Sequence, residues 1–184
     1  MQVIQTPIEG LVEIIPTIYH DERGWFYEAY KEPVFRQAGI VYDFVQENQS
    51  FSKKGVIRGL HFQRHPYAQA KLAMVLSGKV LDVVVDLRPG SKTFGHVYSC
   101  ILDSQRRNML MVPDGFAHGF STLEDTHFLY KCSNVYDKAS EMGIRWNDPG
   151  LGIDWKVTDP IVSEKDQLLP TLAELLRNSL ISRS

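Results

Sequence analysis

The chain has 184 residues and a formal net charge of −2, with 43% hydrophobic and 23% charged residues. We expect one domain, residues 1–184, because this length buries a core without disulfides or metals, and the balanced charge argues against binding to nucleic acid through bulk charge. Cys100 and Cys132 are too few for a disulfide framework or a zinc site. With no long apolar run and no signal peptide in residues 1–10, no membrane span and a cytoplasmic location are expected.

Short strands separated by turn residues make up most of the chain. In chain order the predicted strands are residues 25–30, 44–51, 56–63, 71–76, 79–88, 96–102, 108–112 and 126–133. Residues 79–88 alternate most regularly, with one face formed by Leu81, Val83, Val85 and Leu87 and the other by Val80, Asp82, Val84 and Asp86. Many short strands with turns between them favour a β-sandwich or β-barrel.

Helices are predicted only near the two ends of the chain. Pro33 can occupy the first turn of a short helix that Gly39 would end. After Pro170, leucines recur at helical spacing in a pattern formed by Leu168, Leu172, Leu175, Leu176 and Leu180. We interpret this leucine face as packing against the sheet.

A polar face follows one predicted strand. Alternation places Gln46, Asn48 and Ser50 on the same side of residues 44–51. A polar face of this kind either meets solvent or lines the interior of a closed barrel that binds a ligand. The pattern alone leaves both interpretations open.

The next strand carries Arg58 and His61 in an apolar setting. A histidine among apolar neighbours is either a structural residue or part of a site. Strict alternation puts Arg58 and His61 on opposite faces of the strand. Both can face one pocket only if Gly59 hosts a bulge or the strand ends there.

Lys71 begins the apolar strand at residues 71–76. One interpretation is a charge at a strand end that reaches water. The other is a cation at the mouth of a pocket, where it would stabilise an enolate or a phosphate.

Residues 112–120 give the most specific local motif. The spacing of Pro113, Gly115 and His118 is similar to the second half-motif of the cupin superfamily. His61 and residues 71–78 fall where the first half-motif would lie. The chain therefore resembles a cupin in two segments that are distant in sequence.

The first half-motif departs from the metal-binding pattern. Metal-binding cupins carry paired histidines and then a glutamate seven residues before a glycine. Here Lys71 stands seven residues before Gly78, and Gln63 stands two residues after His61 in place of the second histidine. A lysine at a ligand position repels a metal ion, so no metal site is expected.

Eight segments together resemble the dTDP-4-dehydrorhamnose 3,5-epimerase family, over a span from about Glu9 to Asp166. The segments are DERGWFYE (21–28), FVQENQS (44–50), GVIRGLHFQ (55–63), AQAKL (68–72), VDLRPGSKTFG (85–95), VPDGFAHGF (112–120), FLYKCSNVYD (128–137) and IRWNDPGLGIDW (144–155). The resemblance implies an all-β cupin jelly-roll barrel or sandwich with short peripheral helices, mainly C-terminal. It also implies a homodimer with exchanged N-terminal strands, in which Trp25, Phe26 and Tyr27 are largely buried at or near the interface.

The same resemblance implies roles for individual residues. His61 corresponds to a general base paired with Asp166, Tyr130 to the general acid, and Lys71 to a residue near the developing oxyanion. Substrate contacts correspond to Arg23, Gln46, Asn48, Arg58 and His118, and positions near the nucleotide, some reached across the dimer, to Glu28 and Tyr136. One departure is Met74, where many members carry an arginine.

The implied reaction is epimerisation of a dTDP-linked 4-keto-6-deoxyhexose at C3 and C5, as in dTDP-L-rhamnose biosynthesis for cell-surface polysaccharide such as lipopolysaccharide. Hydrogens on these carbons flank the C4 ketone and are acidic, so a base near neutral pKa can remove them. No redox change occurs, which agrees with the absence of a GxGxxG fingerprint, and no cofactor is expected. The alternatives are an epimerase acting on one centre and a non-catalytic cupin that binds a sugar nucleotide.

Overall fold

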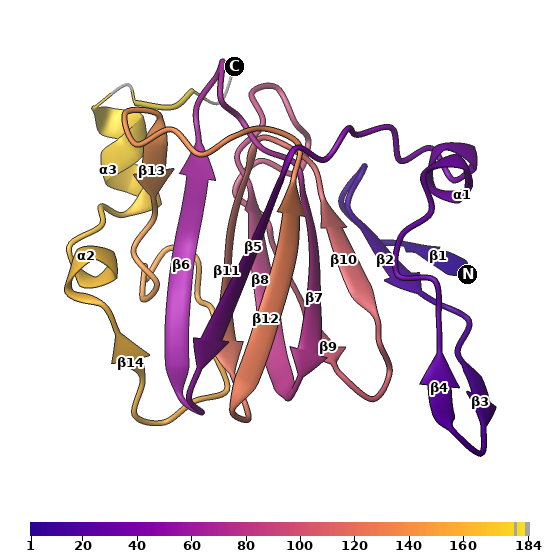
Figure 1. Cartoon of the computed structure of the whole chain (residues 1–184). Helices are drawn as coiled ribbons and strands as arrows, with labels where there is room; N and C mark the ends of the chain where they lie inside the picture. The colour runs from indigo at the N-terminus through magenta and orange to yellow at the C-terminus, as the bar shows by residue number, and fades with distance from the viewer. Residues whose placement is uncertain (179, 183–184) are drawn as a thin grey trace.

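The computed structural model describes residues 1–178 and 180–182, and it is built around two facing β-sheets (Figure 1). The first sheet has the order β1 (Gln2–Gln5), β2 (Val12–Ile15), β10 (Met109–Val112), β7 (Lys71–Ser77), β12 (Thr126–Cys132) and β5 (Gln46–Ser52). The second has the order β13 (Glu141–Gly143), β6 (Val56–Gln63), β11 (Phe116–Thr122), β8 (Lys79–Asp86) and β9 (Val97–Asp103). The predicted all-β cupin architecture is confirmed.

The remaining elements lie around this body. β14 (Ile161–Val162) pairs with β6 in parallel, whereas the pairs within the two sheets are antiparallel. β3 (Tyr19–Asp21) and β4 (Gly24–Phe26) form a separate hairpin that projects away from the sheets in Figure 1. The helices are α1 (Glu32–Gln37), α2 (Glu164–Gln167) and α3 (Leu172–Arg177). None of the helices in the described residues is long and apolar enough to span a membrane.

The core consists of apolar layers inside and outside the sheets. Val80 and Val84 belong to the layer between the sheets, whereas Leu81, Val83 and Val85 pack with C-terminal segments on the outer side of the second sheet. β8 is therefore buried on both faces, which explains its nearly continuous apolar sequence. A third layer covers the outer side of the first sheet and includes residues of α1.

The predicted strands are present, β6 with the predicted bounds and the others with shifted ends, apart from one exception. In residues 25–30 only Trp25 and Phe26 belong to a strand, because the chain leaves the β3–β4 hairpin after Phe26. The strands β1, β2, β3, β11, β13 and β14 were not predicted. β11 escaped the alternation pattern because Gly115 precedes it and Gly119 interrupts it.

Both predicted helical regions are helical. α1 has Pro33 in its first turn, and Gly39 follows its end with a φ of +82°, a conformation that glycine adopts readily. The C-terminal leucine pattern is divided: Leu168 ends α2, Leu175 is fully buried in α3, and Leu180 lies beyond α3. Leu172 and Leu175 of α3 pack against the second sheet as predicted, whereas Leu168 and Leu180 are 78% and 41% exposed and do not.

Candidate active site

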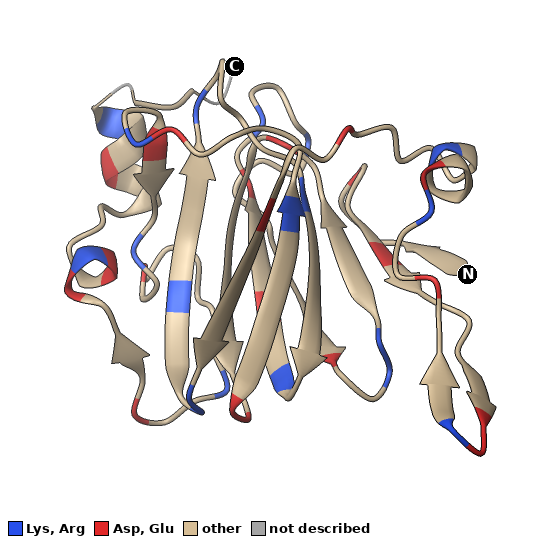
Figure 2. Ribbon diagram, viewed as in Figure 1, with Lys and Arg blue, Asp and Glu red and all other residues tan. Residues whose placement is uncertain are grey.

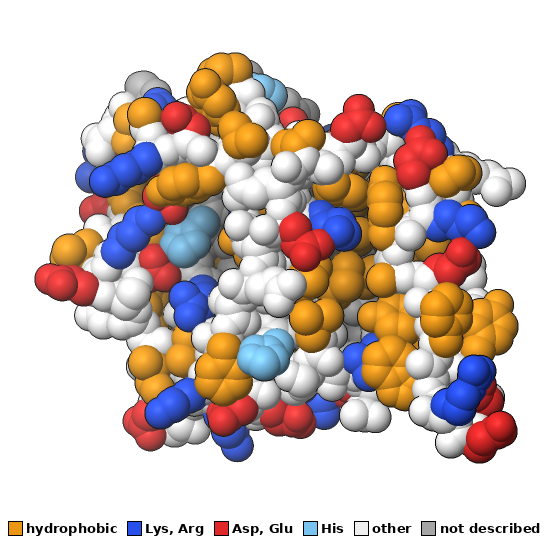
Figure 3. Space-filling model, viewed as in Figure 1, with side chains coloured by type: hydrophobic (Ala, Val, Ile, Leu, Met, Phe, Trp, Pro, Cys, Tyr) orange, Lys and Arg blue, Asp and Glu red, His pale blue; other side chains and the backbone are white. Residues whose placement is uncertain are grey.

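A cavity of about 580 Å³ opens between the two sheets. β5, β7 and β12 of the first sheet and β6 and β11 of the second line it, and the β14–α2 segment forms one edge. Figure 3 shows histidine, basic and acidic side chains gathered around hollows in this face of the molecule. Arg58 is the single lysine or arginine in β6, so it accounts for the blue segment of that strand in Figure 2, and its side chain lines the cavity. The cavity thus places polar and charged groups inside an otherwise apolar sandwich.

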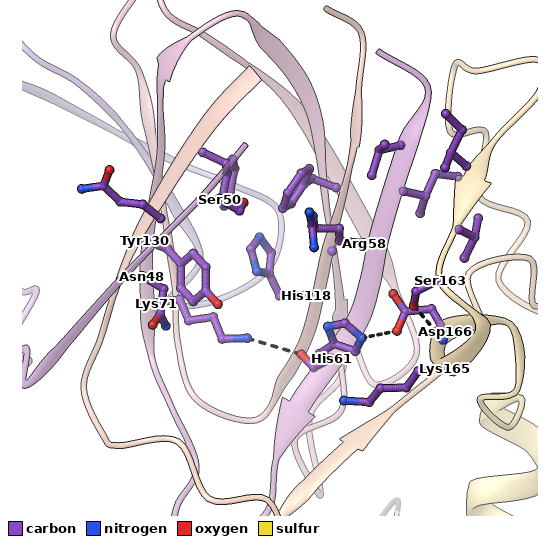
Figure 4. Close-up of a pocket in the computed structure, with 18 residues that line it drawn as sticks. Asn48, Ser50, Arg58, His61, Lys71, His118, Tyr130, Ser163, Lys165 and Asp166 are labelled. Carbon is purple, nitrogen blue, oxygen red and sulfur yellow. Dashed lines mark hydrogen bonds and ion pairs between the residues drawn. The ribbon is translucent and has the colours of Figure 1, made fainter. Parts of the chain in front are cut away.

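His61 and Asp166 form a hydrogen-bonded pair at this cavity (Figure 4). The distance from His61 Nε2 to Asp166 Oδ1 is 2.7 Å, and the second carboxylate oxygen accepts the Gly59 amide at 3.2 Å. Burial alone would raise the pKa of Asp166, but the hydrogen bond and charge of His61 and the bond from Gly59 outweigh it and lower that pKa. Asp166 is therefore a carboxylate at neutral pH, able to orient the imidazole of His61.

α2 delivers Asp166 to this position. Ser163 caps the helix by accepting the Asp166 amide on its side chain, and β14 immediately before it pairs with the start of β6. The position of the Asp166 carboxylate is thus set by the cap of α2 and by the pairing of β14 with β6, the strand that carries His61.

A bulge in β6 brings Arg58 and His61 to the same cavity. His61 pairs with His118 and Arg58 with Phe120, so β6 uses one more residue than β11 between these two pairs. Gly59 within the bulge has a φ of +124°, which an L side chain rarely adopts. The bulge that strict alternation required at Gly59 is present, and both side chains line the cavity.

Lys71 and Tyr130 enter the cavity from the first sheet (Figure 4). The Lys71 ammonium lies 3.5 Å from the His61 carbonyl oxygen and 5.9 Å from the centre of the Tyr130 ring. Burial lowers the pKa of Lys71, opposed by the charges of Cys132, Asp82 and Glu141. Burial raises the pKa of Tyr130, so its hydroxyl keeps its proton at neutral pH. Lys71 is buried and faces the site rather than reaching bulk water.

A second histidine–aspartate pair borders the cavity, with His118 in the lining and Asp82 outside it. His118 Nε2 is 2.9 Å from Asp82 Oδ1 and 3.0 Å from Oδ2, and both residues are buried. Sequence reasoning missed Asp82, although a carboxylate in the middle of a strand buried on both faces was a usable signal, because such a charge needs a partner.

Asn48 and Ser50 also line the cavity, so the polar face of β5 lines the barrel interior. Arg58 Nε donates to Ser52 Oγ at 2.9 Å, which holds the guanidinium beside β5. Gln46 is not among the lining residues; its amide donates to Asn48 Oδ1 at 3.1 Å, and its carbonyl accepts the Tyr136 amide.

Three other sequence-predicted residues lie outside the cavity of this chain. Arg23, with a side chain 84% exposed, pairs with Asp21 at the tip of the β3–β4 hairpin. Glu28 forms an exposed pair with Lys31. The Tyr136 hydroxyl donates to Glu141, whose other oxygen binds Lys165 at the cavity edge. Lys165 was also missed, although it directly precedes Asp166 in the sequence.

Met74 has no contact with the cavity. Its side chain is buried in the layer outside the first sheet, on the opposite face of β7 from Lys71. The departure from arginine at this position therefore leaves the cavity lining of this chain unchanged. The described residues contain no cluster of three or more histidine, cysteine, aspartate or glutamate side chains arranged to hold a metal.

Comparisons with known proteins agree on one family. A family model described as dTDP-4-dehydrorhamnose 3,5-epimerase matches residues 5–174. The chain is 45% identical over 185 residues to the dTDP-4-dehydrorhamnose 3,5-epimerase of Escherichia coli (strain K12), which covers 99% of this chain and 100% of that protein.

Solved structures give the same result. A dTDP-4-dehydrorhamnose 3,5-epimerase from Elizabethkingia anophelis NUHP1 has a TM-score of 0.90 at 47% identity, covering 95% of this chain and 97% of that one. A dTDP-6-deoxy-D-glucose-3,5-epimerase, RmlC, from Legionella pneumophila Philadelphia 1, solved with dTDP-4-keto-L-rhamnose, has a TM-score of 0.93 at 42% identity, covering 100% and 98%. The chain therefore belongs to the dTDP-4-dehydrorhamnose 3,5-epimerase family of isomerases.

Proposed function

We propose that His61, Tyr130 and Lys71 carry out the family's reaction in this cavity, with Asp166 as the partner of the base. The chain is an epimerase of dTDP-L-rhamnose biosynthesis, and its reaction inverts C3 and C5 of a dTDP-linked 4-keto-6-deoxyhexose. The observation that carries our assignment is the His61–Asp166 pair, which opens to a cavity that Tyr130 enters from the facing sheet.

Proton removal is the first step. The hydrogen on C3 or C5 lies next to the C4 ketone, so its loss moves charge onto the ketone oxygen as an enolate. His61 takes this proton, and the Asp166 carboxylate at 2.7 Å stabilises the imidazolium that forms. A neutral imidazole suits this step because its pKa normally lies near neutrality.

The enolate requires a positive partner. Lys71 provides it from a position where water is largely excluded, and such a donor is worth about 3–4 kcal/mol to the transition state. Tyr130 then returns a proton to the opposite face of the carbon. Because burial raises the pKa of Tyr130, the hydroxyl carries that proton before the reaction. Removal on one face and return on the other inverts the centre.

A homodimer completes the proposal. Trp25 and Phe26 on the β3–β4 hairpin are 52% and 65% exposed in the single chain, and large exposed aromatics at one protruding element are typical of an interface. Arg23 and Glu28 lie on the same segment, away from the cavity of their own chain. In a dimer with exchanged N-terminal segments, these residues reach the nucleotide in the partner's cavity.

NMR of the product formed in deuterated water tests the reaction. With a dTDP-4-keto-6-deoxyglucose substrate, each inverted carbon takes up one solvent deuterium, so we expect label at both C3 and C5. Label at only one carbon would identify a one-centre epimerase. Substrate binding without any label would identify a non-catalytic binding protein.

A further inference from the structure

Two glycines on neighbouring strands touch behind the catalytic pair. A Cβ placed on Gly119 of β11 would lie 2.6 Å from the Arg58 carbonyl oxygen and 3.1 Å from Gly59 Cα. In the other direction, a Cβ on Gly59 would lie 2.6 Å from Gly119 Cα. A Cβ essentially never comes within 3.0 Å of another heavy atom, so neither strand has room for a methyl group here.

Glycine is required at Gly119 for a different reason than at Gly59. Gly59 has a positive φ, so glycine is favoured there by backbone conformation alone. The φ of Gly119 lies outside the left-handed region, so a positive φ is not the reason for glycine at this position. Only the close approach of the β6 bulge requires a bare Cα at Gly119.

The β6 bulge is linked to His61, the proposed base, through Asp166. The amide of Gly59 donates to Asp166 Oδ2 at 3.2 Å, while Asp166 Oδ1 bonds to His61 Nε2 at 2.7 Å. The same bulge sets the directions of Arg58 and His61. A displacement of Gly59 away from β11 therefore moves both ends of the His61–Asp166 hydrogen bond.

We propose that Gly119 is a positioning residue of the epimerase: its bare Cα seats the Gly59 bulge against β11 and so holds His61 and Asp166 in reacting geometry. The inference rests on the proposed role of His61 as the base. Gly119 is part of the cavity lining, but a Cβ on it would meet the Arg58 carbonyl oxygen and Gly59 Cα, so the role assigned to it is exerted through the Gly59 bulge.

The test compares Gly119→Ala with matched controls. Gly150 has neither a positive φ nor a place in the cavity lining, and a Cβ there would lie 3.2 Å from a side-chain oxygen of Asp148. Gly150→Ala therefore reports the cost of a crowded glycine-to-alanine change away from the cavity. Leu102, fully buried in β9, supplies a destabilised control in Leu102→Ala. Thermal unfolding first establishes the folded fraction, and deuterium exchange at C3 and C5 is then measured per folded chain.

We expect a 10- to 100-fold loss of exchange in folded Gly119→Ala, because a misplacement of about 1 Å of a catalytic group can cost about 100-fold. Both controls should keep wild-type exchange per folded chain. A second measurement repeats Gly119→Ala in an Asp166→Asn background. If Gly119 acts through the pair, the two losses are strongly non-additive and the double variant is little slower than Asp166→Asn alone.

Normal exchange in folded Gly119→Ala, or additive losses in the double variant, would overturn the proposal. A Gly119→Ala chain that does not fold would also count against it, by assigning Gly119 to folding alone. These outcomes leave the proposed function intact, because that function is tested separately, by the label that the wild type takes up at C3 and C5 and by the exchange that His61→Ala retains.

Discussion

Two histidine–aspartate pairs each contribute a histidine to the cavity lining, and the two pairs differ in exposure. The His61 side chain is 31% exposed and its Asp166 partner 5%, whereas the His118 side chain is 6% exposed and Asp82 is fully buried. Both imidazoles direct Nε2 toward their carboxylates, so Nδ1 is in each case the ring nitrogen that is not bonded to the carboxylate. The more accessible His61 suits repeated proton transfer, and the enclosed His118 suits a fixed contact with the sugar.

Lys71 determines our prediction about metal. A buried ammonium at the position of a cupin carboxylate ligand opposes binding of a divalent cation. We therefore expect dialysis against a strong chelator to leave turnover unchanged, with an untreated sample as the control. Loss of activity that one specific divalent ion restores would contradict this account of Lys71.

The lowered pKa of Asp86 leads to a prediction about how the free energy of unfolding changes at acid pH. Burial would raise its pKa, but hydrogen bonds from Arg88, Ser91 and Thr93 outweigh it and lower the pKa from 3.8 to about 2. Because the folded-state pKa is below the unfolded one, the carboxylate stabilises the fold above about pH 4 and loses this effect as pH falls toward 2. The shift corresponds to about 2 kcal/mol.

Urea unfolding of Asp86→Asn tests this value. The variant should be less stable than wild type by about 2 kcal/mol at pH 7, and the gap should narrow between pH 4 and pH 2. Asp154→Asn, at an exposed carboxylate, is the matched control and should change stability little at either pH. A gap for Asp86→Asn that does not depend on pH would contradict the assignment.

At the scale of elements, α2 and α3 provide a matched pair of helix caps. Ser163 caps α2, which carries Asp166, and Thr171 caps α3, which carries no cavity residue. Loss of either cap costs about 1 kcal/mol. We expect Ser163→Ala to reduce deuterium exchange several-fold and Thr171→Ala to leave it unchanged per folded chain. Equal exchange rates in the two variants would show that the α2 cap does not position Asp166.

The alternation of apolar and polar residues predicted the strands that are apolar on at least one face, such as β8. It failed for strands that are very short or that contain a glycine, because these show no regular alternation. β11 was missed for this reason, although its glycines permit the close approach of β6. The bulge at Gly59 was predicted as a condition, because Arg58 and His61 could not otherwise share a pocket. The partnership of His61 with Asp166 spans 105 residues, so no local pattern contained it and only the family resemblance implied it.

At the scale of the whole molecule, the hairpin aromatics predict a dimer. Sedimentation at micromolar concentration should give twice the chain mass of 21.0 kDa. Phe26→Glu should produce a folded monomer with reduced activity, because Phe26 is 65% exposed in the single chain and makes no core contribution there. Leu180→Glu is the control and should remain dimeric, because Leu180 is exposed and its amide donates to Leu175 of α3, a helix that lies on the opposite side of the molecule from the hairpin in Figure 1. A wild-type monomer with full activity would exclude the exchanged dimer.

The central claim is that His61 removes the proton and Tyr130 returns one from the other face. The most direct measurement is the deuterium exchange rate and melting temperature of the same His61→Ala sample, beside Tyr130→Phe. We predict a folded His61→Ala chain with no exchange and no inversion, since no enolate forms. Tyr130→Phe should retain part of the exchange, because His61 can reprotonate the face it deprotonated, while inversion falls further. A folded His61→Ala chain with normal exchange would contradict the account.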